Sequence, residues 1–334
     1  MKYFWIILCL GLISCSNGNS SKERAKENGE NFPYVEIPTY IQDRDEAIRF
    51  LARNFWKPYF KAAAKENSLY NLDSTKFEEA YARYASAINL IEGSRKGKDA
   101  ASAQKIFSTV AASQKNLFKM ADSLYLAGHK RLLGRLLEIS ERYLYNPNSP
   151  YLNEETYIPA LEAIMELKSM DNTAKMAYKW QLELVSMNRI GTKAADFEFL
   201  QKKGNTFKKG TLHNIDAQYL LLYFNNPDCN SCRGQQSILL SDPAFVNIFE
   251  SGKIKVLSMY IDEQADLWEK HYNEAPRSSN WIYARDQKLI LRDNGLYGIR
   301  AIPSMYLLDR EKNVILKDAT AEKVVQYFNM INRN

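Results

Sequence analysis

Two cysteines, Cys229 and Cys232, are the residues of this 334-residue chain whose type and spacing most clearly predict chemistry. They are three positions apart and follow an apolar run at residues 219–224 and a turn-like segment at residues 225–228. A strand, a turn and a helix start would place both sulfurs at the N-terminus of that helix. The helix dipole and the unpaired N–H groups there favour a thiolate. Thiol–disulfide exchange requires such a thiolate.

Other uses of a cysteine pair fit this chain less well. Zinc would need two more ligands, and the two remaining cysteines, Cys9 and Cys15, lie far away near the N-terminus. The three histidines, His129, His213 and His271, lack the spacing of metal ligands, so we interpret them as surface or core residues and expect no metal or cofactor. A structural disulfide stays open as an alternative, although bridging residues three apart closes almost no loop.

The elements that would position the pair alternate between strands and helices from residue 191 onward. Short apolar runs at residues 220–224 and 254–260 are typical of strands in a covered sheet. Further elements are expected at residues 197–205 (a hairpin), after Cys229 and at 264–272 (helices), 304–308 and 314–317 (strands) and 321–332 (a helix). This alternation predicts an α/β domain with parallel strands over residues 191–334.

Residues 34–190 have the periodicity of helices and few strand signals. Asp43 or Asp45 is expected to cap the first helix, which Pro58 should end or bend. Helices are expected over residues 47–56, 76–92, 100–127, 130–144, 154–170 and 173–189. The segment at residues 145–150 is rich in turn formers, and we interpret it as a connector rather than as part of a partner surface. An all-α N-terminal domain is therefore predicted.

The first residues have the pattern of a signal peptide for export. One positive charge precedes an apolar segment at residues 3–13, which is too short to span a bilayer as a helix. Residues 12–15 resemble a bacterial lipobox, which implies cleavage after residue 14 and lipid attachment to Cys15. Residues 15–33 are mostly polar and read as a flexible tether. We expect a lipoprotein in the cell envelope, facing the periplasm, where a disulfide can persist.

The composition is that of an ordinary globular protein, with 46% apolar and 25% charged residues. A net charge of +6 over this length is small, and no basic stripe or aromatic RNA-binding motif accompanies it. We therefore expect no nucleic-acid partner.

The C-terminal part resembles a TlpA/ResA-type thioredoxin-like domain, a family of thiol–disulfide oxidoreductases. The resemblance runs from Gly191 and rests on residues 195–197, on the cysteine pair and on the segment at residues 302–309. It implies a central mixed sheet flanked by helices. It also implies a cis peptide bond between Ile302 and Pro303 that faces the disulfide.

The same resemblance implies a role for each site residue. Cys229 would be the nucleophile, Cys232 would resolve the mixed disulfide, and Pro303 would shape the groove that holds the partner strand. Pro227, Asp228 and Ile302 would support this site.

Three positions depart from the family pattern. Asp228 stands where a tryptophan is familiar, and its carboxylate would disfavour a neighbouring thiolate. Tyr223 and Gln235 stand at the two positions where relatives carry an aspartate or a glutamate that accepts the proton of the resolving thiol. Asp228 or water would have to take over that role.

The helical part also resembles a known domain. Residues 36–38, 49–56 and 143–157 look like an uncharacterised helical domain that commonly precedes a thioredoxin-like domain in bacterial envelope lipoproteins. This resemblance implies no activity. It leaves room for a protein partner that binds the helical domain.

These observations favour a membrane-tethered thiol–disulfide oxidoreductase that acts on envelope proteins bearing disulfides or thiols. The alternative is a non-catalytic interaction lipoprotein of the same fold, with a permanently closed disulfide. A peroxidase of the peroxiredoxin kind is less favoured, because residues 225–228 do not reproduce the Pro-x-x-x-Thr approach to its cysteine.

Overall fold

The computed structural model describes residues 32–63, 74–93, 100–293 and 295–331. The predicted signal peptide, the lipidation site Cys15 and the predicted tether up to residue 31 lie outside these residues. Among the residues described, no helix is both long and apolar enough to cross a bilayer.

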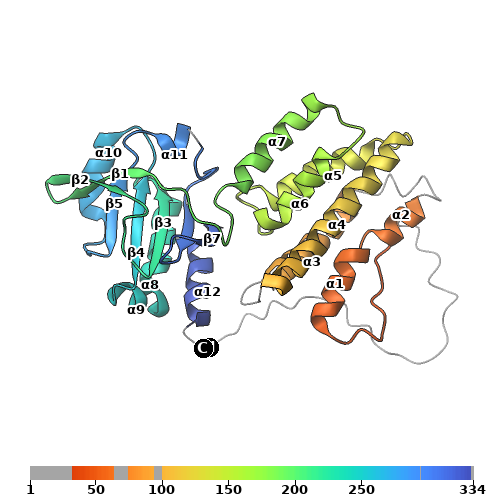
Figure 1. The fold of residues 1–334 in the computed structure, drawn as a ribbon, viewed down its shortest axis with the longest axis horizontal. Helices are drawn as coiled ribbons and strands as arrows, with labels where there is room; N and C mark the ends of the chain where they lie inside the picture. Colours follow the sequence, from red (N-terminus) through yellow and green to blue (C-terminus); the bar gives the residue numbers. More distant parts are fainter. Residues whose placement is uncertain (1–31, 64–73, 94–99, 294, 332–334) are drawn as a thin grey trace.

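Within the described ranges, seven helices precede the first strand and form the helical half of the molecule (Figure 1). They are α1 (Arg44–Asn54), α2 (Lys57–Ala63), α3 (Ser74–Gly93), α4 (Ala100–Leu126), α5 (Arg131–Leu144), α6 (Glu154–Met165) and α7 (Asn172–Ser186). Asp43 caps α1 as predicted, because its carboxylate accepts a hydrogen bond from the Glu46 N–H at 2.7 Å. Pro58 lies in the first turn of α2, where its missing N–H leaves no intrahelical hydrogen bond unmade. The first helix therefore ends before Pro58, and a new helix begins there.

The core of the helical half is rich in aromatic side chains. The apolar side of α3 is buried, with Phe77, Tyr84 and Ile88 fully inaccessible. Trp56 lies 5.7 Å from Phe77 and 5.4 Å from Tyr84 between ring centres. The Tyr84 hydroxyl lies 2.7 Å from the Ser113 hydroxyl on α4, which satisfies a polar group that would be costly to bury alone.

One expected helix ends early. Residues 154–170 were expected to be helical, but α6 stops at Met165. The Asp122 carboxylate on α4 accepts hydrogen bonds from the N–H groups of Lys168 (2.9 Å) and Ser169 (3.0 Å). A long-range acceptor thus replaces the intrahelical carbonyls at these positions, and local periodicity could not reveal it.

The second half is a seven-stranded mixed sheet in the order β2-β1-β5-β4-β3-β6-β7. β3, β4 and β5 are parallel to one another, and the remaining neighbours are antiparallel. The strands are β1 (Glu198–Lys203), β2 (Thr206–Thr211), β3 (Tyr219–Asn225), β4 (Ile254–Tyr260), β5 (Trp281–Arg285), β6 (Ser304–Leu308) and β7 (Val314–Ala319). The predicted α/β architecture with parallel strands is therefore confirmed.

Both faces of the central strands are covered, because alternate residues of β3 enter two different cores. Leu220, Leu222 and Phe224 pack in one core, whereas Leu221 and Tyr223 pack in the other. The second core lies beneath α8, α9 and α12 (Figure 1). The helices of this half are α8 (Asn230–Ser241), α9 (Pro243–Glu250), α10 (Ala265–Lys270), α11 (Ile290–Asp293) and α12 (Ala321–Ile331), with a short 3-10 helix, η2 (His271–Glu274), after α10.

β5 was not predicted, although it completes the parallel part of the sheet. It has only five residues, and its register, with Leu257 opposite Ile282, is set by β4. A strand this short depends on long-range pairing and burial rather than on a local pattern.

The two halves are joined through Arg300, which lies in the loop before β6 and has a side chain that is 12% exposed. Its guanidinium donates to the Tyr145 carbonyl, and its Nη2 lies 2.7 Å from carboxylate oxygens of both Glu154 and Asp318. The guanidinium carbon also stands 4.1 Å from the centre of the Tyr145 ring, in cation–π geometry. The segment at residues 145–150, which we expected to be a connector, thus begins with a residue that contacts the other half.

A second cation, Lys317 on β7, completes this buried charge cluster. Its ammonium lies 2.8 Å from Glu154 and donates to the carbonyls of Val185 (2.8 Å), in the last turn of α7, and of Met187 (2.5 Å), the C-cap of that helix. Burial raises the pKa of the Glu154 carboxyl although Lys317 and Arg300 act to lower it. Desolvation therefore outweighs the attraction to the two cations, and the cluster chiefly fixes how the halves are oriented.

We predict that Glu154→Gln lowers the free energy of unfolding by about 3 kcal/mol, because it leaves buried cations without their carboxylate. Urea titration followed by tryptophan fluorescence measures this change. The exposed Glu162 on the same helix provides a matched control, Glu162→Gln. Equal stabilities of the two variants would contradict this account of the junction.

Candidate functional site

The cysteine pair lies where β3 passes into α8, as the sequence predicted. Cys229 is the N-cap of α8, and its sulfur accepts a hydrogen bond from the Cys232 N–H at 3.1 Å. A disulfide joins the two residues, whose Cα atoms are 5.2 Å apart. Cys232 is buried, with 3% of its surface exposed, whereas Cys229 is half-buried. Cys229 is therefore the more accessible residue of the pair.

The segment at residues 302–303 lies at the same end of the sheet as the disulfide. Phe224 near the end of β3 pairs with Ser304 at the start of β6, so the chains leaving β3 and entering β6 are neighbours. The Ile302–Pro303 peptide bond is cis, as the resemblance implied. Both Ile302 and Cys229 pack against the apolar cluster that contains Cys232. The residues predicted for the site thus come together.

Polar contacts order the loop that precedes Cys229. The Asn226 side chain accepts a hydrogen bond from the Asp228 N–H at 2.9 Å and donates one to Asp262 at 2.7 Å. The Arg233 guanidinium, one turn into α8, donates to the Pro227 carbonyl at 2.5 Å. Arg233 therefore brings a positive charge to the first turn of α8, and Pro227 and Asp228 form the rim beside Cys229.

His271 is a residue of this site that sequence analysis did not identify. Its Nε2 lies 3.3 Å from the Asp228 carboxylate and its Nδ1 lies 2.8 Å from the Glu274 carboxylate. Our interpretation as a surface or core histidine was incomplete, since its ring is mostly buried between two acids. Asp228 and His271 both follow parallel strands, whose C-terminal ends meet at one edge of the sheet. That placement could have indicated from the sequence that the two side chains lie close together.

The residues at the two proton-acceptor positions have other partners. The Tyr223 hydroxyl donates to the Cys232 carbonyl at 2.6 Å, and burial raises the pKa of this phenol. It therefore stays neutral and supports the first turn of α8. Gln235 accepts a hydrogen bond from the Ala321 N–H at 2.5 Å, and its amide nitrogen lies 3.3 Å from Glu322. Both side chains thus tie α8 to its surroundings.

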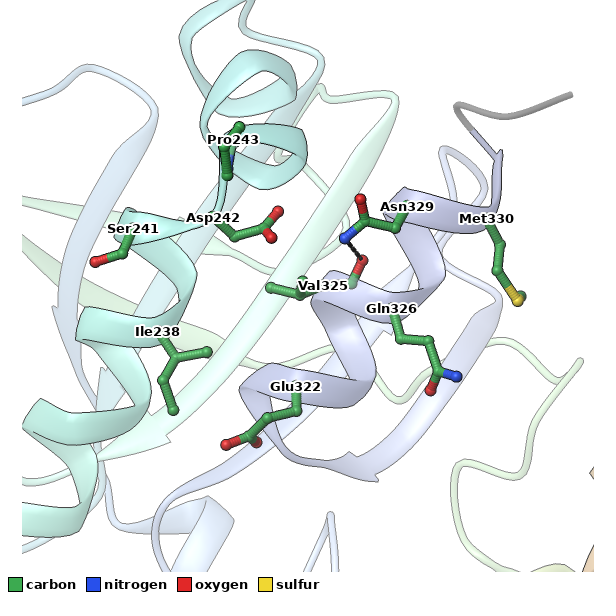
Figure 2. Close-up of a pocket in the computed structure, with 9 residues that line it drawn as sticks. All are labelled: Ile238, Ser241, Asp242, Pro243, Glu322, Val325, Gln326, Asn329 and Met330. Carbon is green, nitrogen blue, oxygen red and sulfur yellow. Dashed lines mark hydrogen bonds between the residues drawn. The ribbon is translucent and has the colours of Figure 1, made fainter. Parts of the chain in front are cut away.

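A groove of about 770 Å³ opens between the C-terminal part of α8 and α12 (Figure 2). Its lining is mixed, with apolar Ile238 and Val325 beside polar Asp242 and Glu322. The cysteines do not line it. In the part of the chain that the structure describes, no cluster of three His, Cys, Asp or Glu side chains is arranged to hold a metal ion.

The helical half matches a family described as a domain of unknown function (DUF5106), over residues 14–188. Nucleoredoxin from Xenopus laevis is 27% identical over 111 residues, which are 32% of this chain and 25% of the nucleoredoxin. This chain thus spans about a quarter of the length of the curated relatives that it matches.

Solved structures from Bacteroides resemble larger parts of the chain. The C-terminal domain of an uncharacterized protein from Bacteroides fragilis is 42% identical, covering 42% of this chain and 98% of that chain, with a TM-score of 0.40. A thioredoxin-like protein from Bacteroides caccae is 30% identical, covering 90% of this chain and 98% of that chain, with a TM-score of 0.75. The sheet half is therefore thioredoxin-like, and the chain belongs to the DUF5106 family.

Proposed function

We propose that this protein is a membrane-tethered thiol–disulfide oxidoreductase of the TlpA/ResA type. The observation that carries the proposal is the disulfide at the N-terminus of α8, half-accessible at Cys229 and beside residues 302–303. The helix dipole and Arg233 both place positive potential there, which favours the thiolate of Cys229 in the reduced protein.

The exchange proceeds in two steps. The Cys229 thiolate attacks one sulfur of a partner disulfide, the partner's S–S bond breaks, and its other sulfur leaves as a thiolate. Cys232 then loses its proton and attacks Cys229, which breaks the mixed disulfide and releases the second partner thiolate. Two electrons pass from the Cys229–Cys232 dithiol to the partner, and the reverse sequence oxidises a partner dithiol.

The substrate would be an extended segment of an envelope protein bearing a disulfide or a thiol. The main chain around Pro303 would hold that segment by hydrogen bonds, as the resemblance implies. The cluster around Arg300 holds residues 300–304 in place, because the Ser304 hydroxyl and the Arg300 guanidinium both bind Asp318. We propose that the helical half keeps this surface in place.

We predict that Cys229→Ser reduces exchange by about a hundredfold or more, because a serine hydroxyl is not ionised at neutral pH and cannot form the mixed disulfide. The assay is the reduction of insulin disulfides with dithiothreitol as electron donor. Retention of the wild-type rate in this variant would contradict the catalytic proposal. That result would favour the alternative of an interaction lipoprotein with a permanently closed disulfide.

A second prediction uses the unequal exposure of the two sulfurs. Cys232→Ser should trap partners on Cys229, because the buried residue that resolves the mixed disulfide is missing. Non-reducing electrophoresis of envelope extracts should show adducts that disappear on reduction. The double variant Cys229→Ser/Cys232→Ser is the control, and adducts of equal amount in it would contradict these roles.

The tether is tested separately from the chemistry. We predict that Cys15→Ser abolishes labelling with a radioactive fatty acid and moves the protein from the membrane fraction to the soluble envelope fraction. A variant that stays in the membrane fraction with its label unchanged would contradict lipidation at Cys15. The exchange activity of the purified variant should not change.

A further inference from the structure

A carboxylate stands next to the accessible sulfur of the redox site. Asp228 immediately precedes Cys229, and 63% of its side chain is exposed. A negative charge there disfavours the Cys229 thiolate and opposes the helix dipole. The reduced protein therefore needs something to offset the charge of Asp228 if it is to exchange disulfides at neutral pH.

His271 is placed to supply that compensation. Its ring is only 14% exposed and lies between two acids, with Nε2 3.3 Å from Asp228 and Nδ1 2.8 Å from Glu274. A ring protonated on both nitrogens would present a positive charge to both carboxylates, and that charge would offset the charge of Asp228. The Glu274 carboxylate lies on the far side of the ring.

The sheet brings these groups together. β3 and β4 are parallel neighbours, with Phe224 opposite Met259, so the segments after both strands meet at one edge. Asp228 follows β3, and His271 begins η2 after β4 and α10. The hydrogen bond from Asn226 to Asp262 ties the same two segments together at 2.7 Å.

Other ionisable groups lie around Asp228 and His271. Asp262 follows β4, and Arg285 ends β5. Burial raises the pKa of Tyr260 and of Tyr283, so both phenols stay neutral. The positive charge of Arg233 is bound to the Pro227 carbonyl and to the Asn230 side chain. Among the described residues, His271 is the basic side chain that lies within ion-pair distance of Asp228.

We propose that His271 is a positioning residue of the redox site, which holds Asp228 and offsets its charge beside Cys229. This inference rests on the proposed function and adds a determinant of its redox equilibrium. Reduction of the disulfide takes two electrons and one proton from a partner dithiol, leaving a thiolate at Cys229 and a thiol at Cys232. His271 stabilises this reduced state by weakening the repulsion between Asp228 and the thiolate.

The test compares reduction potentials of four proteins expressed from residue 16: the parent, His271→Asn, Asp228→Asn and the double variant. Each is equilibrated with dithiothreitol or glutathione buffers at pH 7, and free thiols are counted by alkylation and mass. His271→Asn should shift the equilibrium about tenfold toward the disulfide, which is about 30 mV more negative. Asp228→Asn should shift it in the opposite direction, and in that background His271→Asn should have less than half its effect.

Two further variants separate charge from folding. His271→Gln preserves a donor at a similar position, so it should fold if His271→Asn does not, and it should still shift the equilibrium toward the disulfide. His129→Asn, in the helical half, controls for the loss of a histidine elsewhere and should leave the equilibrium unchanged.

The inference is overturned if both His271 variants change the equilibrium less than twofold, or if the effect of His271→Asn is undiminished in Asp228→Asn. A different result would contradict the proposed function, namely that the parent protein itself does not reduce insulin. The potential is measured without a protein partner, so the two failures are distinguishable.

Discussion

The guanidinium of Arg300 is the contact on which the arrangement of this molecule depends. It binds the Tyr145 carbonyl and Glu154 in the helical half and Asp318 in the sheet half, three residues before Pro303. Because Glu154 is buried and also faces Lys317, these groups are satisfied only when the two halves are correctly docked. The domain of unknown function is thus joined to the segment that flanks the disulfide.

A second constraint acts at the N-terminus of α8. The helix dipole and Arg233 favour a thiolate at Cys229, whereas Asp228 opposes it. Tyr223 occupies the position of the usual buried aspartate and donates to the Cys232 carbonyl, so it fixes geometry without taking a proton. In the proposed exchange, the charges on the rim would therefore set the chemistry of the pair more than a buried acid beneath it.

The position of the cysteine pair was predictable because the sequence patterns that indicate it are local. A buried apolar strand, a turn and two cysteines follow one another along the chain, and the segment from Ile302 to Ser304 leads directly into the next strand. The contact between Arg300 and Glu154 joins residues 146 positions apart, and no periodic pattern in the sequence predicts it. The pairing of His271 with Asp228 requires the strand order, and β5 requires its neighbour β4, so neither followed from sequence alone.

The reduction potential of the Cys229–Cys232 disulfide tests the central claim most directly. Expressed from residue 16, the chain carries only this pair of cysteines, and its free thiols can be titrated against dithiothreitol and glutathione buffers. A midpoint between about −120 and −270 mV, the range of working exchangers, is the result that we predict. A midpoint below about −300 mV would mark the bond as structural and contradict the account.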